Sequence, residues 1–451
     1  MRALLKRWPL LLVAVLALSM SLGLSCGEDE EDGDTTPSAG ETAAATKGPA
    51  TGGDTTGVTD TEITIGTLLP MSNSSAAAWG VPLSRGMKAY YDYINDQGGI
   101  YGRKINFIVA DSQYTGPVAS ESVRKLVERD NIFALQGSLG TAAHSAVWKY
   151  LEEKGVPDMY ILTGNTKWTV PIVRTRFAFL VDYITEGRIL GKYIADNFDG
   201  KKLGIIAQND DFGKEGEQGL RQGLEDENAD MEIVVEYYDE TQNDVTSQVQ
   251  RLKNANVDVI GFYGMPLQTA SLMKTARETL SWDVPIVITG VDAVEVVATL
   301  AGLDNIEGAV SVVFGHQAFE TDVPGVAKHN EIMAKYAPDV TPDNLTLTGY
   351  SISEALVNNL KQAGPDLTRE SFLDAAESVC KYMSSTGLVP SSMTATDHRP
   401  TEVEVYVKAT VDRSVDPPTF KWEPFGEPFG FEGTKECTAP TPPPGYDEQP
   451  K

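Results

Sequence analysis

The chain has 451 residues, of which 41% are apolar and 22% charged, so it can build the cores of more than one domain. Its formal charge of −27, from 64 acidic and 37 basic residues, repels nucleic acid. Three cysteines without a CxxC pair and four scattered histidines offer no zinc-type ligand spacing. We therefore expect no nucleic-acid partner, no metal centre and no other cofactor.

Residues 1–25 have the pattern of a signal peptide. Three basic residues precede an uncharged run, and the apolar part of this run is too short for a membrane-spanning helix. Cys26 follows directly and resembles the acylated cysteine of bacterial lipoproteins, although Gly23 stands where such sites usually carry leucine. We expect an extracytoplasmic protein that is anchored to the cell membrane by a lipid on Cys26. An ordinary signal peptide followed by an incidental cysteine is the alternative.

Residues 26–60 differ in composition from the rest of the chain. They begin with an acidic run at 28–34 and continue with threonine, glycine, alanine, serine and proline. Like charges repel one another and small polar side chains bury little apolar surface. The segment is therefore predicted to be a flexible linker between the lipidated cysteine and a folded body.

From residue 62 onward, strand-like and helix-like patterns alternate. Apolar β-type runs are found at 62–69, 105–110, 132–135, 233–236, 259–262 and 285–288, and helical patterns at 83–94, 118–127, 142–153, around 249–252 and at 293–300. Strands that alternate with helices of this length predict βαβ units and parallel sheets. The fold class is therefore α/β.

Two stretches of the chain echo each other. Each contains a strand, an aspartate, a helix, a second strand, a glycine, a second helix and a Val-Pro pair, and the aspartate precedes the valine by 45 residues in both (111 to 156, 239 to 284). Two copies of one α/β half predict two similar lobes that face a cleft, with the ligand at the carboxyl ends of the strands. Chance similarity between ordinary α/β units is the alternative.

Several motifs resemble those of the leucine/isoleucine/valine-binding family, the type I solute-binding proteins of ABC importers. The similarity covers about residues 63–314 and extends more weakly to about 411. Its most specific motif is IND-x-GGI-x-GRK at 94–104, which we expect to end a helix and to start an edge strand away from the cleft. The other motifs are Ile63-Thr-Ile-Gly66, Trp79-Gly80, Gly137-Ser-Leu-Gly-Thr141, Gly155-Val-Pro157, Asp210-Asp-Phe-Gly213 and Ala276-Arg277.

The resemblance implies two lobes, each a parallel sheet with helices on both faces, joined by a three-crossing hinge. Lobe 1 would comprise residues 61–182 and 315–390, and lobe 2 residues 183–314 and 391–435. The crossings would lie near 181–182, near 314–315 and within 385–400. Residues 436–451 form a proline-rich tail. Because exported proteins tend to bridge paired cysteines, we expect a disulfide between Cys380 and Cys437.

Specific site residues follow from the resemblance. Hydroxyl and N–H groups of Ser138 and Thr141 would receive a ligand carboxylate, or act only as helix caps. Trp79 and Phe212 would contribute aromatic surface, although burial in a core is the usual role of such rings. Asp292 would pair with a ligand ammonium, or cap the helix that follows it. The implied ligand-binding set is Trp79, Ser138, Thr141, Leu162, Thr163, Gly164, Phe212, Met265 and Asp292.

Three positions depart from the pattern of amino-acid binders. Leu162 and Gly164 stand where these proteins tend to have a small residue and then serine or threonine, so Thr163 would have to supply the missing hydroxyl. Met265 replaces an aromatic residue. The carboxylate-binding set is therefore only partly present. An amino acid of the branched-chain type or a related one is the leading ligand, and amides and small carboxylic or aromatic acids are alternatives.

The sequence contains no G-x-S-x-G or G-x-x-x-x-G-K-[ST] motif and no metal-ligand cluster, so no catalytic residue is assigned and no enzyme is expected. The predicted function is that of a monomeric solute-binding lipoprotein. It would deliver its small-molecule ligand to an ABC permease in the membrane when the cleft closes. A sensory module that signals to a membrane partner is the alternative.

Overall fold

The computed structural model describes residues 53–73, 75–431 and 436–450. The predicted signal peptide, Cys26 and most of the predicted linker lie outside the described residues. Within the described residues, no helix combines the length and the apolar character that crossing a bilayer requires.

The first sheet contains five parallel strands in the order β2-β1-β3-β4-β5. The strands are β1 (Glu62–Leu69), β2 (Lys104–Asp111), β3 (Ala134–Gln136), β4 (Asp158–Ile161) and β5 (Arg176–Ala178). The connecting helices are α1 (Ala77–Asp96), α2 (Gly116–Glu128), α3 (Thr141–Ser145), α4 (Trp148–Glu153) and the short 3-10 helix η1 (Thr166–Trp168). The predicted strand at 62–69 is confirmed to the residue.

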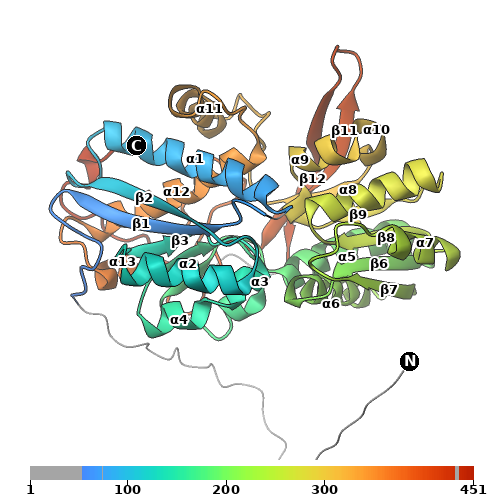
Figure 1. The fold of residues 1–451 in the computed structure, drawn as a ribbon, viewed down its shortest axis with the longest axis horizontal. Helices are drawn as coiled ribbons and strands as arrows, with labels where there is room; N and C mark the ends of the chain where they lie inside the picture. The colour runs from blue at the N-terminus through green and yellow to red at the C-terminus, as the bar shows by residue number, and fades with distance from the viewer. Residues whose placement is uncertain (1–52, 74, 432–435, 451) are drawn as a thin grey trace, which may run out of the picture. The chain divides into compact units, whose positions relative to one another are not determined.

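The second sheet repeats this topology. Its five parallel strands run in the order β7-β6-β8-β9-β10. In each sheet the second strand along the chain is at the edge, the first lies beside it, and the third, fourth and fifth follow. The strands of the second sheet are β6 (Lys202–Gln208), β7 (Glu232–Tyr238), β8 (Val259–Tyr263), β9 (Ile286–Ile288) and β10 (Val310–Val313). The internal echo in the sequence therefore reflects two α/β halves of equal strand order, and the two sheets form separate groups in Figure 1.

Several helices accompany the second sheet. They are α5 (Tyr183–Phe198), α6 (Asp211–Asp226), α7 (Thr246–Asn254), α8 (Pro266–Lys274), the π-helical turn η2 (Thr275–Thr279), the 3-10 helix η3 (Gly290–Asp292), α9 (Glu295–Ala301) and α10 (Leu303–Ile306). The sheet is extended by an antiparallel hairpin of β11 (Val403–Asp412) and β12 (Thr419–Gly430), which the sequence analysis did not assign. Figure 1 shows this hairpin reaching beyond the helices.

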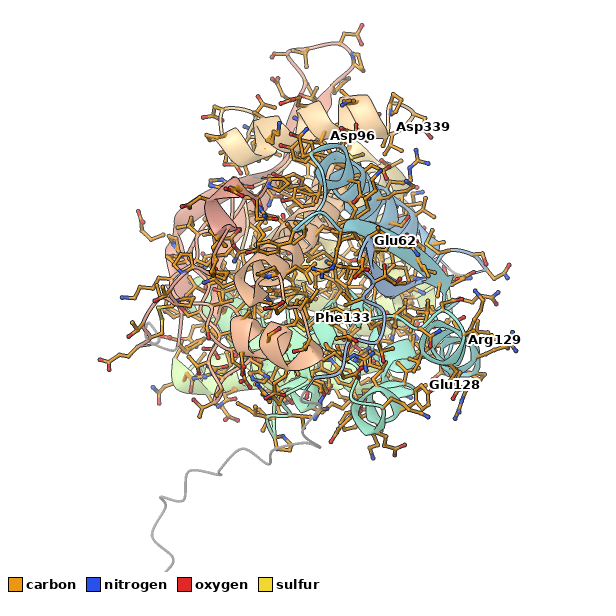
Figure 2. All side chains as sticks on the ribbon, turned by 90° about the vertical axis from the view of Figure 1, so that its left-hand side faces the viewer. Glu62, Asp96, Glu128, Arg129, Phe133 and Asp339 are labelled. Atoms are coloured by element: carbon orange, nitrogen blue, oxygen red, sulfur yellow. A yellow bond between two sulfur atoms is a disulfide. The ribbon has the colours of Figure 1, made fainter. Side chains whose placement is uncertain are left out.

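Three helices that follow β10 return to the first sheet's elements. They are α11 (Pro324–Tyr336), α12 (Asn344–Ala363) and α13 (Arg369–Ala376). The Tyr336 hydroxyl of α11 donates to Asp96 at the end of α1 (2.8 Å), and Asp96 is labelled in Figure 2. Phe372 of α13 packs edge-on against Phe133, with ring centroids 5.2 Å apart. The chain therefore passes between the two groups of elements three times, after β5, after β10 and before β11.

The IND-x-GGI-x-GRK motif has a structural role. Asn95 near the end of α1 donates to the Ile105 carbonyl (2.8 Å) and accepts from the Ile105 N–H (2.7 Å), which fixes the helix end to β2. Gly99 has φ +73° and lies so close to the Arg103 carbonyl that a Cβ atom would clash with it. Because β2 is an edge strand, the expectation that the motif ends a helix and starts an edge strand is confirmed.

A disulfide joins Cys380, which follows α13, to Cys437 in the C-terminal tail, with an S–S distance of 2.05 Å. The tail ends in the 3-10 helix η4 (Tyr446–Glu448). Gln449 accepts a hydrogen bond from the Tyr101 N–H (2.7 Å), and the Tyr446 hydroxyl donates to Asn358 (3.0 Å). The proline-rich tail is thus bound to elements of the first group.

Candidate functional site

A cavity lies where loops from both sheets meet. It holds about 650 Å³ of empty space, its opening included. Its lining includes Leu139 and Thr141 after β3, Leu162 after β4 and Met265 after β8, so the carboxyl ends of strands in both sheets contribute. The full lining is Trp79, Leu83, Tyr114, Leu139, Gly140, Thr141, Leu162, Leu180, Tyr183, Phe212, Met265, Val291, Val294, Phe314, Leu345 and Thr348. Among these described residues, none is charged.

Five of the predicted ligand-binding residues line this cavity: Trp79, Thr141, Leu162, Phe212 and Met265. The Phe212 ring packs against Tyr183, with centroids 4.7 Å apart. Trp79 is buried, and its Nε1–H has no hydrogen-bond partner among the described residues. The cavity therefore offers mainly apolar surface, and one of its lining residues carries an unpaired indole donor.

Thr141 ends a series of hydrogen-bonded hydroxyl groups. The Tyr183 hydroxyl donates to Thr163 Oγ1 (3.3 Å), and Thr163 Oγ1 lies 2.5 Å from Thr141 Oγ1. If each hydroxyl donates to the next, the Thr141 hydrogen is left for an acceptor in the cavity. Thr163 itself does not line the cavity, and its hydroxyl contacts Thr141, which does.

Ser138 lies outside the cavity lining. Its hydroxyl lies 2.9 Å from Nδ1 of His144, and Nε2 of His144 lies 3.0 Å from Asp158. All three side chains are buried, and none of them lines the cavity. The serine–histidine–aspartate arrangement thus has no access to a solute in the cavity and joins β4 to the segment after β3.

Gly164 also lies outside the cavity lining, and packing explains the glycine. A Cβ atom at this position would lie 2.7 Å from the Val181 carbonyl oxygen and 2.8 Å from the Tyr183 ring. The Gly164 carbonyl accepts a hydrogen bond from the Tyr183 N–H (2.8 Å). The residue brings the chain after β4 close to the start of α5, which holds Tyr183 at the cavity.

Asp292 has a protein partner outside the cavity lining. The side chain is fully buried, accepts a hydrogen bond from the Thr269 hydroxyl of α8 and is absent from the cavity lining. Burial raises the pKa of this carboxyl well above its usual range. The alternative role as a helix cap is wrong, because η3 ends at Asp292 and Val294 is the N-cap of α9.

The predicted helix at 142–153 is in fact two helices, α3 and α4, separated by Ala146 and Val147. Gly140 is the N-cap of α3 with φ 101°, and no side chain caps this helix. The capping alternative for Ser138 and Thr141 is therefore wrong. Because α3 has only five residues, its N-terminus carries little helix dipole to attract a carboxylate.

Several lining residues were missed by sequence reasoning. Leu345 and Thr348 come from α12, Phe314 follows β10, and Tyr114 follows β2. Tyr114 and Phe314 follow strands at their carboxyl ends, so the rule that placed Leu162 could have indicated them. Nothing in the local sequence pattern of α12 distinguishes the side chains that line the cavity from those that pack in the hydrophobic core.

Two contacts join the segments on either side of the cavity. Thr166 of η1 donates to Glu215 of α6 through its N–H (3.0 Å) and its hydroxyl (2.5 Å). The Asn344 N–H at the start of α12 donates to Glu295 of α9 (3.1 Å). Burial is the main cause that raises the pKa of each carboxyl to about 7. Each contact joins an acid of the second group to a backbone N–H of the first.

Two α/β halves of equal strand order, with a cavity lined by loops from both, define a two-lobed binding protein of the type I periplasmic fold. A family model described as "Periplasmic binding protein" matches residues 62–410, and the chain belongs to this family. It is a family of solute-binding proteins and not of enzymes, and its members act outside the cytoplasm.

Curated relatives and solved structures agree with this assignment. The chain is 23% identical over 318 residues to "Leu/Ile/Val-binding protein homolog 1" of Brucella abortus (strain 2308), covering 68% of this chain and 81% of the relative. A branched-chain amino acid ABC transporter structure from Thermus thermophilus with bound valine has a TM-score of 0.72 at 19% identity. The match covers 83% of this chain and 98% of that one. A fatty acid ABC transporter substrate-binding protein from Thermomonospora curvata has a TM-score of 0.71 at 23% identity. The match covers 84% of this chain and 95% of that one.

Proposed function

We propose that this protein is the extracytoplasmic solute-binding component of an ABC importer, and that it carries a small apolar carboxylic acid to the permease. The observation that supports the proposal best is the cavity between the two groups of elements, whose described lining has apolar and hydroxyl groups but no charge. Closure of two lobes around a shared ligand is favoured only as far as the ligand contacts both of them.

The choice of an acid follows from the polar groups. With Thr163 donating to Thr141, the Thr141 hydroxyl has a hydrogen for the ligand, and the Nε1–H of Trp79 is a second donor, so both suit a carboxylate or carbonyl oxygen. An α-amino acid also needs a partner for its ammonium group, and Asp292 is engaged by Thr269 away from the cavity. Burying an unpaired ammonium is costly. Branched-chain amino acids are the second candidate, because a relative's name refers to leucine, isoleucine and valine.

Matched ligand pairs test the ligand class. Leucine and 4-methylpentanoate, or valine and 3-methylbutanoate, differ only in the ammonium group. We expect the acids to raise the thermal unfolding midpoint and the amino acids to leave it unchanged, since a ligand at 100 times its Kd contributes about 2.7 kcal/mol. The reverse pattern would favour the amino-acid candidate. Absence of any stabiliser in a panel extended to longer fatty acids and amides would contradict the solute-binding proposal.

The membrane anchor is tested separately at Cys26. If Cys26 is acylated, Cys26→Ala should release the protein from the membrane fraction without altering ligand binding by the body. Metabolic labelling with a fatty-acid analogue should be lost in the same variant. Membrane retention together with unchanged labelling would contradict the lipid anchor.

A further inference from the structure

A second cavity lies among the three segments that pass between the two groups of elements. It holds about 990 Å³ of empty space, its opening included. Val181 after β5, Phe314 and Gly315 after β10, and Thr386 and Gly387 before β11 all line it. We call this cavity the acidic chamber. The acidic chamber adjoins the first cavity, because five residues line both: Leu180, Val291, Val294, Phe314 and Thr348.

Two acidic side chains, Glu186 and Glu404, line the acidic chamber. Glu186 lies in the first turn of α5 and Glu404 on β11, and they are only 4% and 3% exposed. Glu186 accepts a hydrogen bond from the Thr289 hydroxyl (2.7 Å). Oε2 of Glu404 has no hydrogen-bond partner among the described residues. Burial raises the pKa of both carboxyls, and Glu186 raises that of Glu404 further.

Neither acid has a basic partner in the chamber. The described lining contains no lysine or arginine, and its one histidine, His316, pairs with Glu320 (3.3 Å). Arg399 lies near Glu404 in sequence, and it forms ion pairs with Asp182, Asp397 and Glu402. Buried charges are normally paired, because leaving a carboxylate without a partner in a low-dielectric site is costly. The chamber therefore has space for a cation and two carboxyls whose ionised form a bound cation would stabilise.

The rest of the lining favours an organic cation over a metal ion. Ser351, Thr386 and Thr401 contribute hydroxyl oxygens, which accept hydrogen bonds from an ammonium group. The Phe179 and Phe314 rings lie edge to face, with centroids 5.5 Å apart, and provide aromatic surface to an alkylammonium. Among the described residues, no group of three or more histidine, cysteine or acidic side chains could hold a metal ion.

We propose that the acidic chamber is a second binding site, which takes a primary alkylammonium ion between Glu186 and Glu404. The two carboxylates neutralise and orient the ammonium group, while the aromatic and aliphatic lining receives the alkyl part. The site is distinct from the first cavity, whose described lining has no charge.

Butylamine, which is protonated at pH 8, tests the site directly. Butanol has the same alkyl chain without the charge, and sodium chloride at equal ionic strength controls for screening. In isothermal titration and thermal-shift measurements on the mature protein, we expect saturable binding and a higher unfolding midpoint with butylammonium alone. Failure of butylammonium to bind, or equal effects from butanol or sodium chloride, would overturn the proposal.

Glu404→Gln keeps the shape of the side chain and removes its charge. We expect it to weaken butylammonium binding at least about tenfold, as loss of one partner of a buried charge pair does. Glu427→Gln on β12 makes the same change at an exposed position and should leave the affinity unaltered. Glu186→Gln provides a second variant if the first does not fold, because a glutamine oxygen can still accept the hydrogen bond from Thr289.

Phe212→Ala separates the two sites, since Phe212 lines the first cavity and not the acidic chamber. It should weaken binding of 4-methylpentanoate and leave butylammonium binding intact. If Phe212→Ala abolishes butylammonium binding, or if Glu404→Gln leaves it unchanged, the amine does not occupy the chamber and the proposal fails. Neither result would affect the test of the solute-binding function with the acid panel.

Discussion

The carboxylate of Glu215 on α6 accepts two hydrogen bonds from Thr166 on η1, at 3.0 Å from the backbone N–H and 2.5 Å from the hydroxyl. This contact joins segments on the two sides of the cavity. Burial raises the pKa of Glu215 to about 7, and repulsion from Asp182 and Asp211 adds to this effect. If the lobes close when the solute binds, solute binding is therefore linked to protonation of Glu215.

The sign of the linkage gives the first prediction. Opening would return Glu215 to water and to its ordinary pKa of 4.5, so the closed form holds more protons than the open form between pH 4.5 and about 7. Closure should weaken as the pH rises through this window. We expect 4-methylpentanoate to bind several-fold more tightly at pH 5.5 than at pH 8 in isothermal titration.

Glu215→Gln should reduce this pH dependence, since glutamine does not titrate. Glu225→Gln, an exposed position on the same helix, is the matched control. Part of the slope should remain in Glu215→Gln, because Glu295 has a pKa of about 7 in its contact with Asn344. A wild-type affinity that is constant from pH 5.5 to 8 would show that closure is not linked to these carboxyls.

The second prediction concerns the hydroxyl groups of Thr141 and Thr163. Thr141→Val removes the donor at the cavity, and we expect about 10- to 100-fold weaker binding of 4-methylpentanoate, as for a lost hydrogen bond to a charged group. Thr141→Ser keeps the hydroxyl and should retain most of the affinity. Thr163→Val should weaken binding less than Thr141→Val does. The double variant should lose less binding free energy than the sum of the losses in the two single variants.

Thr348→Val is the matched control for this series. Thr348 lines the same cavity, but its hydroxyl already donates to the Asn344 carbonyl (2.8 Å). The substitution should therefore change the affinity much less than Thr141→Val does. Equal losses in the two variants would indicate that the general polarity of the cavity, rather than a donor at Thr141, determines binding.

Asp292→Asn provides the third prediction. The folded-state pKa of Asp292 is raised, so its ionisation makes the free energy of unfolding fall as the pH rises above the unfolded value of about 3.8. Asparagine lacks this titration and can still accept the hydrogen bond from Thr269. We expect the variant to unfold at a higher temperature than the wild type at pH 8, with a smaller difference at pH 4.

Ligand affinity distinguishes this structural role from the one implied by the family resemblance. Asp292→Asn should leave binding of 4-methylpentanoate unchanged, because the residue does not line the cavity. Loss of binding without any change in thermal stability would instead support a direct contact between Asp292 and the ligand.

Local sequence patterns predicted the structure where local geometry alone decides it. The apolar run at 62–69 predicted β1 to the residue, and the repeated spacing predicted two halves with the same strand order. Positions after strand ends, such as Leu162 and Met265, reached the cavity because parallel strands bring their carboxyl ends to one edge.

Local sequence patterns say least where a distant partner determines what a side chain contacts. Asp292 follows a strand as predicted, but Thr269 on α8 engages its carboxyl. Ser138 is engaged by His144, and Gly164 serves the packing of Tyr183. No local pattern in the sequence reports such contacts, because each depends on how the two elements pack.

The last prediction concerns the disulfide between Cys380 and Cys437. The bridge spans 57 residues of chain, which include the β11–β12 hairpin and the crossing that precedes it. In the chain-entropy model, closing a loop of this length stabilises the folded state by about 4 kcal/mol. The double variant Cys380→Ser/Cys437→Ser should therefore unfold at a clearly lower temperature, with 4-methylpentanoate binding retained below that transition.

Dithiothreitol should lower the unfolding midpoint of the wild type to that of the double variant and should leave the double variant unaffected. The tail should also be cut more readily by a protease in the reduced protein, because only noncovalent contacts such as those of Tyr446 and Gln449 would then hold it. Equal midpoints for oxidised wild type and double variant would mean that the tail and the hairpin are held by packing, with no contribution from the bridge.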